Sequence, residues 1–129
     1  MPLVTVSRRQ GRPPAENRQI LEAVHASLVE AFKIPEHDRN HRLLEHDTAH
    51  FEVPPDRSES FTLVEISAYP GRSDDAKRAL YRAIAARLEA IGVAPADVFV
   101  ILNEPALINW STRNGVSTAD VRPPFKLDV

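Results

Sequence analysis

Apolar residues recur along two stretches of this chain at every third or fourth position, a spacing that predicts amphipathic helices. In the first stretch these residues are Ile20, Val24, Leu28 and Phe32, and in the second they are Leu80, Ile84, Leu88 and Ile91. Pro13 and Pro14 stand where proline is tolerated at a helix start, Ser73 is expected to cap the second helix, and Gly92 is expected to end it. Each helix therefore has one apolar face to pack against a sheet.

Shorter apolar runs predict four strands, at residues 3–7, 42–45, 61–67 and 98–104. Residues 98–102 are continuously apolar, which indicates a strand buried on both faces. The polar segment 46–60 is expected to be a loop, and Asn114-Gly115 predicts a tight hairpin turn. Residues 122–129 are expected to form an arm over a neighbouring copy.

The predicted elements fall into an internal repeat, because Gly11-Arg12 returns as Gly71-Arg72 and other matches share that offset. These further matches are Arg18 with Arg78, Ala23 with Ala83, Ala26 with Ala86, Leu28 with Leu88 and Pro35 with Pro95. We therefore expect an α/β (α+β) fold of one domain, residues 1–129, made of duplicated β-α-β units at about 2–46 and 61–105. The units would form a four-stranded mixed sheet with two helices on one face. No further long helix is predicted to cover the other face, so we expect a homo-oligomer.

Composition narrows the classes of function. The chain has 129 residues, with 16 Lys and Arg against 18 Asp and Glu, and no basic block. We therefore expect no nucleic-acid partner and no membrane partner. No apolar run approaches the roughly 18 residues of a membrane span, and no leader is evident, so a cytoplasmic location is expected. The absence of cysteine excludes disulfides, thiolate catalysis and sulfur-ligated metals.

Pro2 precedes the first predicted strand and is the first candidate for chemistry. Removal of Met1 would leave a secondary amine at the start of the chain. Because an α-amino group has a pKa near 8, such an amine is close to neutral at physiological pH and can act as a base. The alternative is that a small second residue carries no function.

Arg72 and Asp38 are the charged candidates. Arg72 lies at a strand-to-helix turn, where its guanidinium could bind a carboxylate; alternatively it is a solvated turn residue, or the Arg12 and Arg72 pair merely records the duplication. Asp38 follows the first helix, and its alternative role is that of a capping or surface residue. Trp110 is either a pocket wall or a core residue under the C-terminal hairpin.

The histidines raise the possibility of a metal site. His46 and His50 are four residues apart and lie beside Glu45 and Asp47. Since this segment is predicted to be a loop and offers no clear third ligand, we expect no metal site.

Several of these features together resemble the tautomerase superfamily. They are the Met-Pro start, the duplicated unit, residues 71–78 (Gly-Arg-Ser-Asp-Asp-Ala-Lys-Arg) and an aromatic residue ahead of a Gly-containing C-terminal turn. Residues 32–39 (Phe-Lys-Ile-Pro-Glu-His-Asp-Arg) resemble the malonate semialdehyde decarboxylase group in particular. The resemblance implies a homotrimer, an active site at the amino-terminal proline and no cofactor.

Carried over by position, the resemblance implies Pro2 as the catalytic amine, Asp38 as the acid, Arg72 as the carboxylate-binding arginine and Trp110 as an aromatic pocket residue. The decarboxylase group has two arginines separated by a proline before the second helix, whereas residues 68–72 (Ala-Tyr-Pro-Gly-Arg) contain one, and Tyr69 is expected to line the pocket instead. The expected substrate is a small oxo-carboxylate, converted by keto-enol tautomerisation or by decarboxylation or hydration of a 3-oxo acid. The alternative is a catalytically silent member of the superfamily that acts as a binding or structural oligomeric protein.

Overall fold

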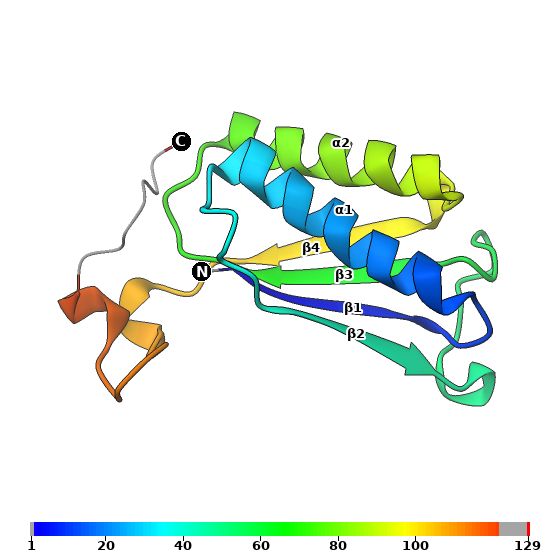
Figure 1. Ribbon diagram of the computed structural model, residues 1–129, viewed down its shortest axis with the longest axis horizontal. Helices are drawn as coiled ribbons and strands as arrows, with labels where there is room; N and C mark the ends of the chain where they lie inside the picture. Colours follow the sequence, from blue (N-terminus) through cyan, green and yellow to red (C-terminus); the bar gives the residue numbers. More distant parts are fainter. Residues whose placement is uncertain (1, 122–128) are drawn as a thin grey trace.

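In the computed structural model, one mixed β-sheet carries two helices across a single face (Figure 1). The structure describes residues 2–121 and residue 129. In chain order the main elements are β1 (Leu3–Arg9), α1 (Pro14–Phe32), β2 (His41–His46), β3 (Thr62–Ser67), α2 (Asp74–Ile91) and β4 (Val98–Asn103). Short 3₁₀ helices in the described residues are η1 (Thr48–His50), η2 (Pro95–Asp97), η3 (Leu107–Asn109) and η4 (Thr118–Asp120).

The sheet order is β2-β1-β3-β4, and its pairing pattern follows from the repeat. Each unit contributes a parallel pair, β1 with β2 and β3 with β4, whereas the units meet through the antiparallel pair of β1 with β3. Parallel neighbours require a crossover, and α1 and α2 supply the two crossovers on the same face. The predicted duplicated β-α-β fold is confirmed.

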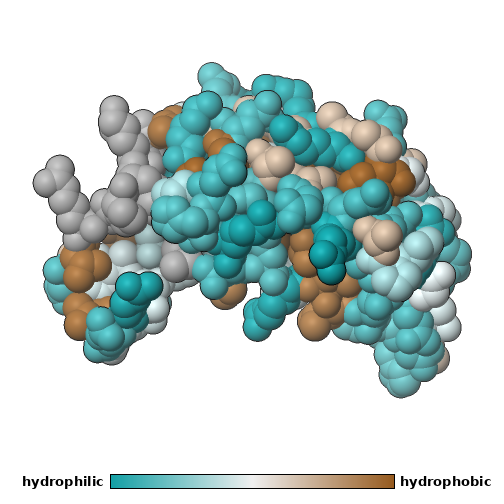
Figure 2. All heavy atoms as spheres, viewed as in Figure 1, coloured by the Kyte–Doolittle hydropathy of each residue, from teal (hydrophilic) through white to brown (hydrophobic). Residues whose placement is uncertain are grey.

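The core lies between the helices and the sheet. The apolar stripes of both helices are fully buried, except that Ile91 is only half-buried. They pack over sheet residues of the same face, which are Val4, Val6, Val64 and Ile66. Burying a side chain of this size stabilises the fold by about 1.5–3 kcal/mol. The opposite, outward surface of the helices is largely hydrophilic (Figure 2).

The predicted helix ends are confirmed for α2. The Ser73 side chain accepts a hydrogen bond from the Ala76 amide at 3.1 Å, and Gly92 ends the helix with a φ of 112°. Helix α1 has Pro14 in its first turn but no side-chain cap, and it ends at Lys33, whose amide bonds to the Val29 carbonyl.

Within the single chain, residues 98–102 are buried on one face only, so the predicted burial of their second face would require a neighbouring copy. In β4, Val98, Val100 and Leu102 are half-buried on the helix side, but Phe99 and Ile101 are 45% and 43% exposed. The reason is that β4 is an edge strand and that no described part of this chain covers the second face of the sheet. Leu3 and Leu44, at 40% and 48% exposure, also lie on that uncovered face.

The predicted hairpin turn is confirmed, whereas most of the predicted arm lies outside the described residues. Asn114 and Gly115 both have positive φ, 62° and 69°, and Arg113 bridges to Val116 across them. A two-residue turn of this hand favours asparagine followed by glycine. Of the predicted arm, residues 122–128 lie outside the described residues. Among the residues that are described, no helix is both long and apolar enough to cross a membrane.

Candidate active site

Strand pairing brings the candidate residues to one end of the sheet. Val4 pairs with His41 and Leu3 pairs with Ser67, so the start of β1 lies between the start of β2 and the end of β3. Ser67 pairs in turn with Asn103 at the end of β4. One end of the sheet is therefore flanked by Pro2, Asp38, the segment 68–72 and Glu104, and Figure 1 shows the N-terminus there. We call it the Pro2 end of the sheet.

Pro2 is buried, directly ahead of the first strand. The next strand residues are held on both sides, since the Val4 amide donates to the Asn40 carbonyl at 2.8 Å and Leu3 is in register with Ser67. The sheet consequently holds the backbone at Pro2 in place, so the ring of Pro2 has a fixed orientation.

Arg72 is a buried cation, so the alternative that it is a solvated turn residue is wrong. Arg72 is only 6% exposed, and its guanidinium lies 4.9 Å from the centre of the Phe32 ring. It donates to the carbonyl oxygens of Tyr69 and Phe32 at 3.3 and 3.4 Å. Burial lowers the pKa of Arg72, and the negative charges of Glu104 and Asp38 oppose that shift. A guanidinium nevertheless stays protonated in proteins.

The turn before α2 explains why Arg72 points inward. Gly71 has a φ of 125°, which lies in a region that side-chain-bearing residues rarely adopt. The chain can therefore reverse between β3 and α2 within a few residues. This reversal carries the Arg72 side chain back under the end of α1.

Asp38 lies in the connection between α1 and β2 and is half-buried. Its amide donates to the Pro35 carbonyl at 3.0 Å, which closes a turn. The carboxylate acts electrostatically on Arg72, as its effect on the pKa of that residue shows. The structure thus brings together the acid and the arginine that the sequence singled out.

Tyr69 and Trp110 form an aromatic pair beside Arg72. Their ring centres are 5.0 Å apart at an interplanar angle of 85°, and Tyr69 is only 5% exposed. Trp110 also donates from Nε1 to the Pro105 carbonyl at 3.0 Å and accepts from the Thr118 amide at its own carbonyl. Trp110 therefore anchors the C-terminal segment and contacts the predicted pocket residue at the same time.

Sequence reasoning missed an ion pair at the Pro2 end. Glu104 follows β4 and accepts from Lys77 Nζ of α2 at 2.6 Å. The hydrogen bond to Glu104 raises the pKa of Lys77. Glu104 could have been found from its place directly after the last apolar strand, at the edge where the other candidates gather.

Arg12, which matches Arg72 in the repeat, lies at the opposite end of the sheet, where β1 ends and α1 begins. Its Nε bonds to Glu16 at 3.1 Å, and Glu16 also pairs with the fully buried Arg8 at 2.8 Å. At the equivalent place in the second unit the chain has Ala76. Arg12 thus takes no part in the Pro2 end.

The two histidines considered for metal binding have other contacts. The His46 ring stacks on Phe51 with centres 5.0 Å apart, and His50 Nδ1 lies 3.4 Å from Asp47. Within residues 2–121 and 129, no group of three or more metal-binding side chains is arranged to hold an ion.

Comparison with known protein families gives two matches that together span residues 2–113. A family model described as "Tautomerase enzyme" matches residues 38–113, and a second model with the same description matches residues 2–60. The probable tautomerase YusQ of Bacillus subtilis (strain 168) is 28% identical over 121 residues, which cover 89% of this chain and 95% of that protein.

Solved structures give the same fold. The FG41 malonate semialdehyde decarboxylase inhibited by 3-bromopropiolate superposes with a TM-score of 0.84 and 31% identity, covering 95% of this chain and 99% of that chain. A fused 4-OT described as a symmetric trimer superposes with a TM-score of 0.80 and 26% identity, covering 91% of this chain and 96% of that one.

Proposed function

Because the chain belongs to the tautomerase family, we propose that it is an enzyme in which Pro2, freed of Met1, acts on small oxo-carboxylates as general base and acid or as nucleophile. The observation that carries the proposal is the gathering of Pro2, Arg72 and Asp38 at one end of the sheet. A buried position for Pro2 supports it further, since an apolar environment lowers the pKa of an amine and keeps it neutral.

In the tautomerisation route, Arg72 binds the substrate carboxylate and neutral Pro2 removes a proton from the carbon next to the carbonyl. The electron pair moves onto the carbonyl oxygen to give an enolate, which the guanidinium stabilises. Protonated Pro2 then returns the proton to another atom of the conjugated system. Tyr69 and Trp110 exclude water from one side of this reaction.

In the decarboxylation route, Pro2 attacks the carbonyl of a 3-oxo acid and loses water to form an iminium ion. The C–C bond to the carboxylate breaks, CO₂ leaves, and the electron pair is taken up by the iminium nitrogen. Asp38 assists by activating or polarising water, and the resulting enamine is protonated and hydrolysed. Both routes use only an amine, a guanidinium and a carboxylate, so neither calls for a cofactor.

We further propose that the protein is a homotrimer in which the uncovered sheet face packs against neighbouring copies. Leu3, Leu44, Phe99 and Ile101 are large apolar side chains exposed on that face. In a single chain these four side chains remain exposed to water, whereas a closed assembly would bury their apolar surface. The trimeric fused 4-OT supports the choice of three copies.

The test of the catalytic proposal begins with intact-mass measurement, which reports whether Met1 has been removed. The enol form of phenylpyruvate is then followed by ultraviolet absorbance, and a panel of 2-oxo and 3-oxo acids is screened for product. We expect turnover of at least one compound and its loss in the Pro2→Ala variant. Equal turnover in that variant would refute the proposed role of Pro2, and no turnover across the panel would favour the silent binding protein. Borohydride trapping followed by mass measurement separates the iminium route from acid-base catalysis.

A further inference from the structure

The uncovered face of the sheet carries two opposite charges in one row of side chains. Strand pairing places in this row Arg42 of β2, Thr5 of β1, Glu65 of β3 and Ile101 of β4. Successive side chains of a strand point to opposite faces, and the next residues along β1 and β3, Val6 and Val64, are buried beneath the helices. The row therefore points away from the helices, and both of its charged residues are exposed.

Neither of these charges is compensated within the described chain. Arg42 donates to the uncharged Thr5 hydroxyl at 3.2 Å, which uses one of the five donors of a guanidinium. Because β1 separates β2 from β3, the backbones at Arg42 and Glu65 are about 9–10 Å apart. Within residues 2–121 and 129, neither Arg42 nor Glu65 takes part in an ion pair.

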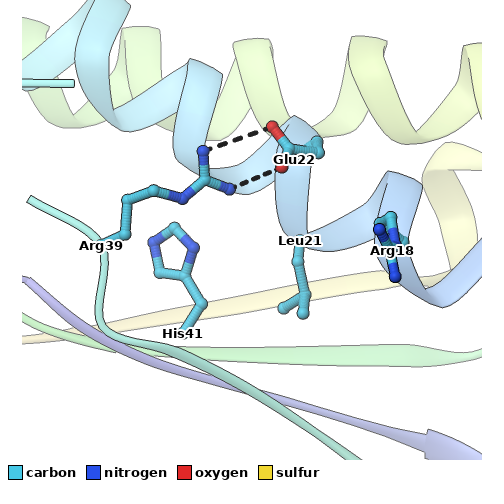
Figure 3. Close-up of a pocket in the computed structure, with 5 residues that line it drawn as sticks. All are labelled: Arg18, Leu21, Glu22, Arg39 and His41. Carbon is cyan, nitrogen blue, oxygen red and sulfur yellow. Dashed lines mark hydrogen bonds and ion pairs between the residues drawn. The ribbon is translucent and has the colours of Figure 1, made fainter. Parts of the chain in front are cut away.

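The other arginines around this half of the sheet are neutralised by carboxylates of the chain itself. Arg9, on the same face, pairs with Glu59 at 2.8 Å. Arg39, just ahead of β2, donates to both carboxylate oxygens of Glu22 in α1, at 2.7 and 3.4 Å (Figure 3). Arg42 differs from them, since its counter-charge has to come from outside the described chain.

Glu65 cannot stay hydrated if the face is covered. It lies on β3, an inner strand of the sheet, directly beside Ile101, which is 43% exposed. A body that buries Ile101 would consequently remove water from Glu65 as well. An unpaired carboxylate in such a place is strongly unfavourable, so the covering surface has to bring a cation. Arg42 lies on the edge strand β2, from which a long side chain can reach a neighbour.

The internal repeat makes the two halves of this row equivalent in backbone but not in charge. Thr5 and Glu65 pair with each other and are separated by the offset of the repeat, so their outer partners, Arg42 and Ile101, are equivalent as well. The half formed by β1 and β2 thus carries the cation, and the half formed by β3 and β4 carries the anion. A closed ring of three copies needs two different surfaces on each copy, and these halves supply them.

We propose that Arg42 of one copy pairs with Glu65 of the next copy, so that the β1 and β2 half of each sheet face packs on the β3 and β4 half of its neighbour. This inference rests on the homotrimer proposed above and adds which surfaces meet and in which order. A guanidinium and a carboxylate can form two parallel hydrogen bonds, which fixes the register of the contact. Leu44 beside Arg42, and Ile101 beside Glu65, would keep water from the pair.

Charge reversal tests the pairing, with the mass of the assembly measured by light scattering coupled to size-exclusion chromatography. Arg42→Glu and Glu65→Arg each place like charges together and should weaken association by at least about 10²-fold. The combined variant Arg42→Glu/Glu65→Arg should recover the trimer. Arg82→Glu, at an exposed arginine of α2, is the matched control and should leave the mass unchanged.

Cross-linking separates a contact between copies from one within a chain. The protein has no cysteine, so Arg42→Cys and Glu65→Cys each introduce a single thiol. When the two variants are expressed together and treated with a short bismaleimide, we expect a covalent dimer that contains one chain of each kind. Either variant alone should stay uncross-linked, because residue 42 does not face residue 42 in a head-to-tail ring.

The outcomes separate this pairing from the proposals it rests on. A monomeric parent protein would refute the trimer and the pairing together. A trimeric parent whose mass survives both single reversals would refute the pairing and leave the trimer standing. Cross-links within Arg42→Cys alone would refute the head-to-tail order. None of these measurements uses turnover, so the catalytic proposal is tested separately.

Discussion

The Arg72 guanidinium lies over the ring of Phe32, 4.9 Å from its centre, and donates to the Phe32 carbonyl at 3.4 Å. Phe32 is the last residue of α1, whereas Arg72 precedes α2. This contact therefore joins the two β-α-β units beside Pro2. It holds the guanidinium plane in a fixed orientation, which a flexible cation could not maintain.

Arg72→Lys should lower kcat/KM on the best oxo-carboxylate by about 10²-fold, because lysine keeps the charge but not the planar donor pair. Steady-state kinetics measure this change, and thermal unfolding checks that the fold is retained. Arg82→Lys serves as the matched control on an exposed helix face. Unchanged kcat/KM in Arg72→Lys would argue against a bound carboxylate at this residue.

Asp38→Asn should separate the two proposed routes. Decarboxylation of a 3-oxo acid should fall by about 10²-fold, since assistance by a carboxylate is removed. Tautomerisation should change by less than about threefold, because Pro2 transfers both protons in that route. Product analysis by NMR on one enzyme preparation reports both activities. Equal losses in both reactions would contradict this separation. They would show that Asp38 either acts in a step common to both reactions or only stabilises the fold.

Burial of His41 predicts a dependence of stability on pH. The pKa of this residue is about 4 in the folded protein and 6.5 in a model peptide. Between these values the unfolded chain binds the proton more readily, so stability falls as the pH is lowered from 6.5 to 4 and is not lost further through this group below 4. The slope from His41 is at most about 1.4 kcal/mol per pH unit.

Urea unfolding of the parent and of His41→Gln at several pH values tests this prediction. The free-energy difference between the two proteins should change between pH 6.5 and 4 and be constant above 7. A constant difference throughout would mean that His41 titrates normally. Exposed His50 supplies the control variant, His50→Gln, which should leave the slope unchanged.

Ile101→Asp should dissociate the proposed trimer, because a carboxylate on the uncovered sheet face would have to lose its hydration when copies associate. Light scattering coupled to size-exclusion chromatography gives the mass directly. Tyr81→Asp is the matched control, since Tyr81 is similarly exposed, at 38%, but lies on the outer side of α2. A parent protein that elutes as a monomer would contradict the assembly itself.

The periodic features of the sequence predicted the fold because helix stripes, caps and turn residues act locally. The paired helices, the Ser73 cap and the Asn114-Gly115 turn are all confirmed for this reason. The apolar run at residues 98–102 indicates that the strand is covered on both faces but not by which chain, and within the single chain Phe99 is exposed.

At the candidate site, the inward orientation of Arg72 depends on Gly71 and on the end of α1, which lies 40 residues away in the chain. The Lys77–Glu104 ion pair likewise joins residues that are far apart in the sequence. Contacts of this kind produce no repeating pattern of residues from which they could be predicted. The functional roles proposed for Pro2, Asp38, Arg72, Tyr69 and Trp110 stay predictions.

Glu16, which pairs with Arg8 and Arg12 at the end of the sheet remote from Pro2, has Ala76 as its counterpart in the second unit. In one copy of the repeat, therefore, a carboxylate of the chain itself neutralises the arginines, and in the other copy the helix supplies none at that place. The two ends of one sheet thus differ: one holds the chain together through its own ion pairs, and the other is the end at which we propose that an anionic substrate binds. Substitutions at the Arg8, Arg12 and Glu16 end should consequently change the rate of unfolding, and those at the Pro2 end should change substrate specificity.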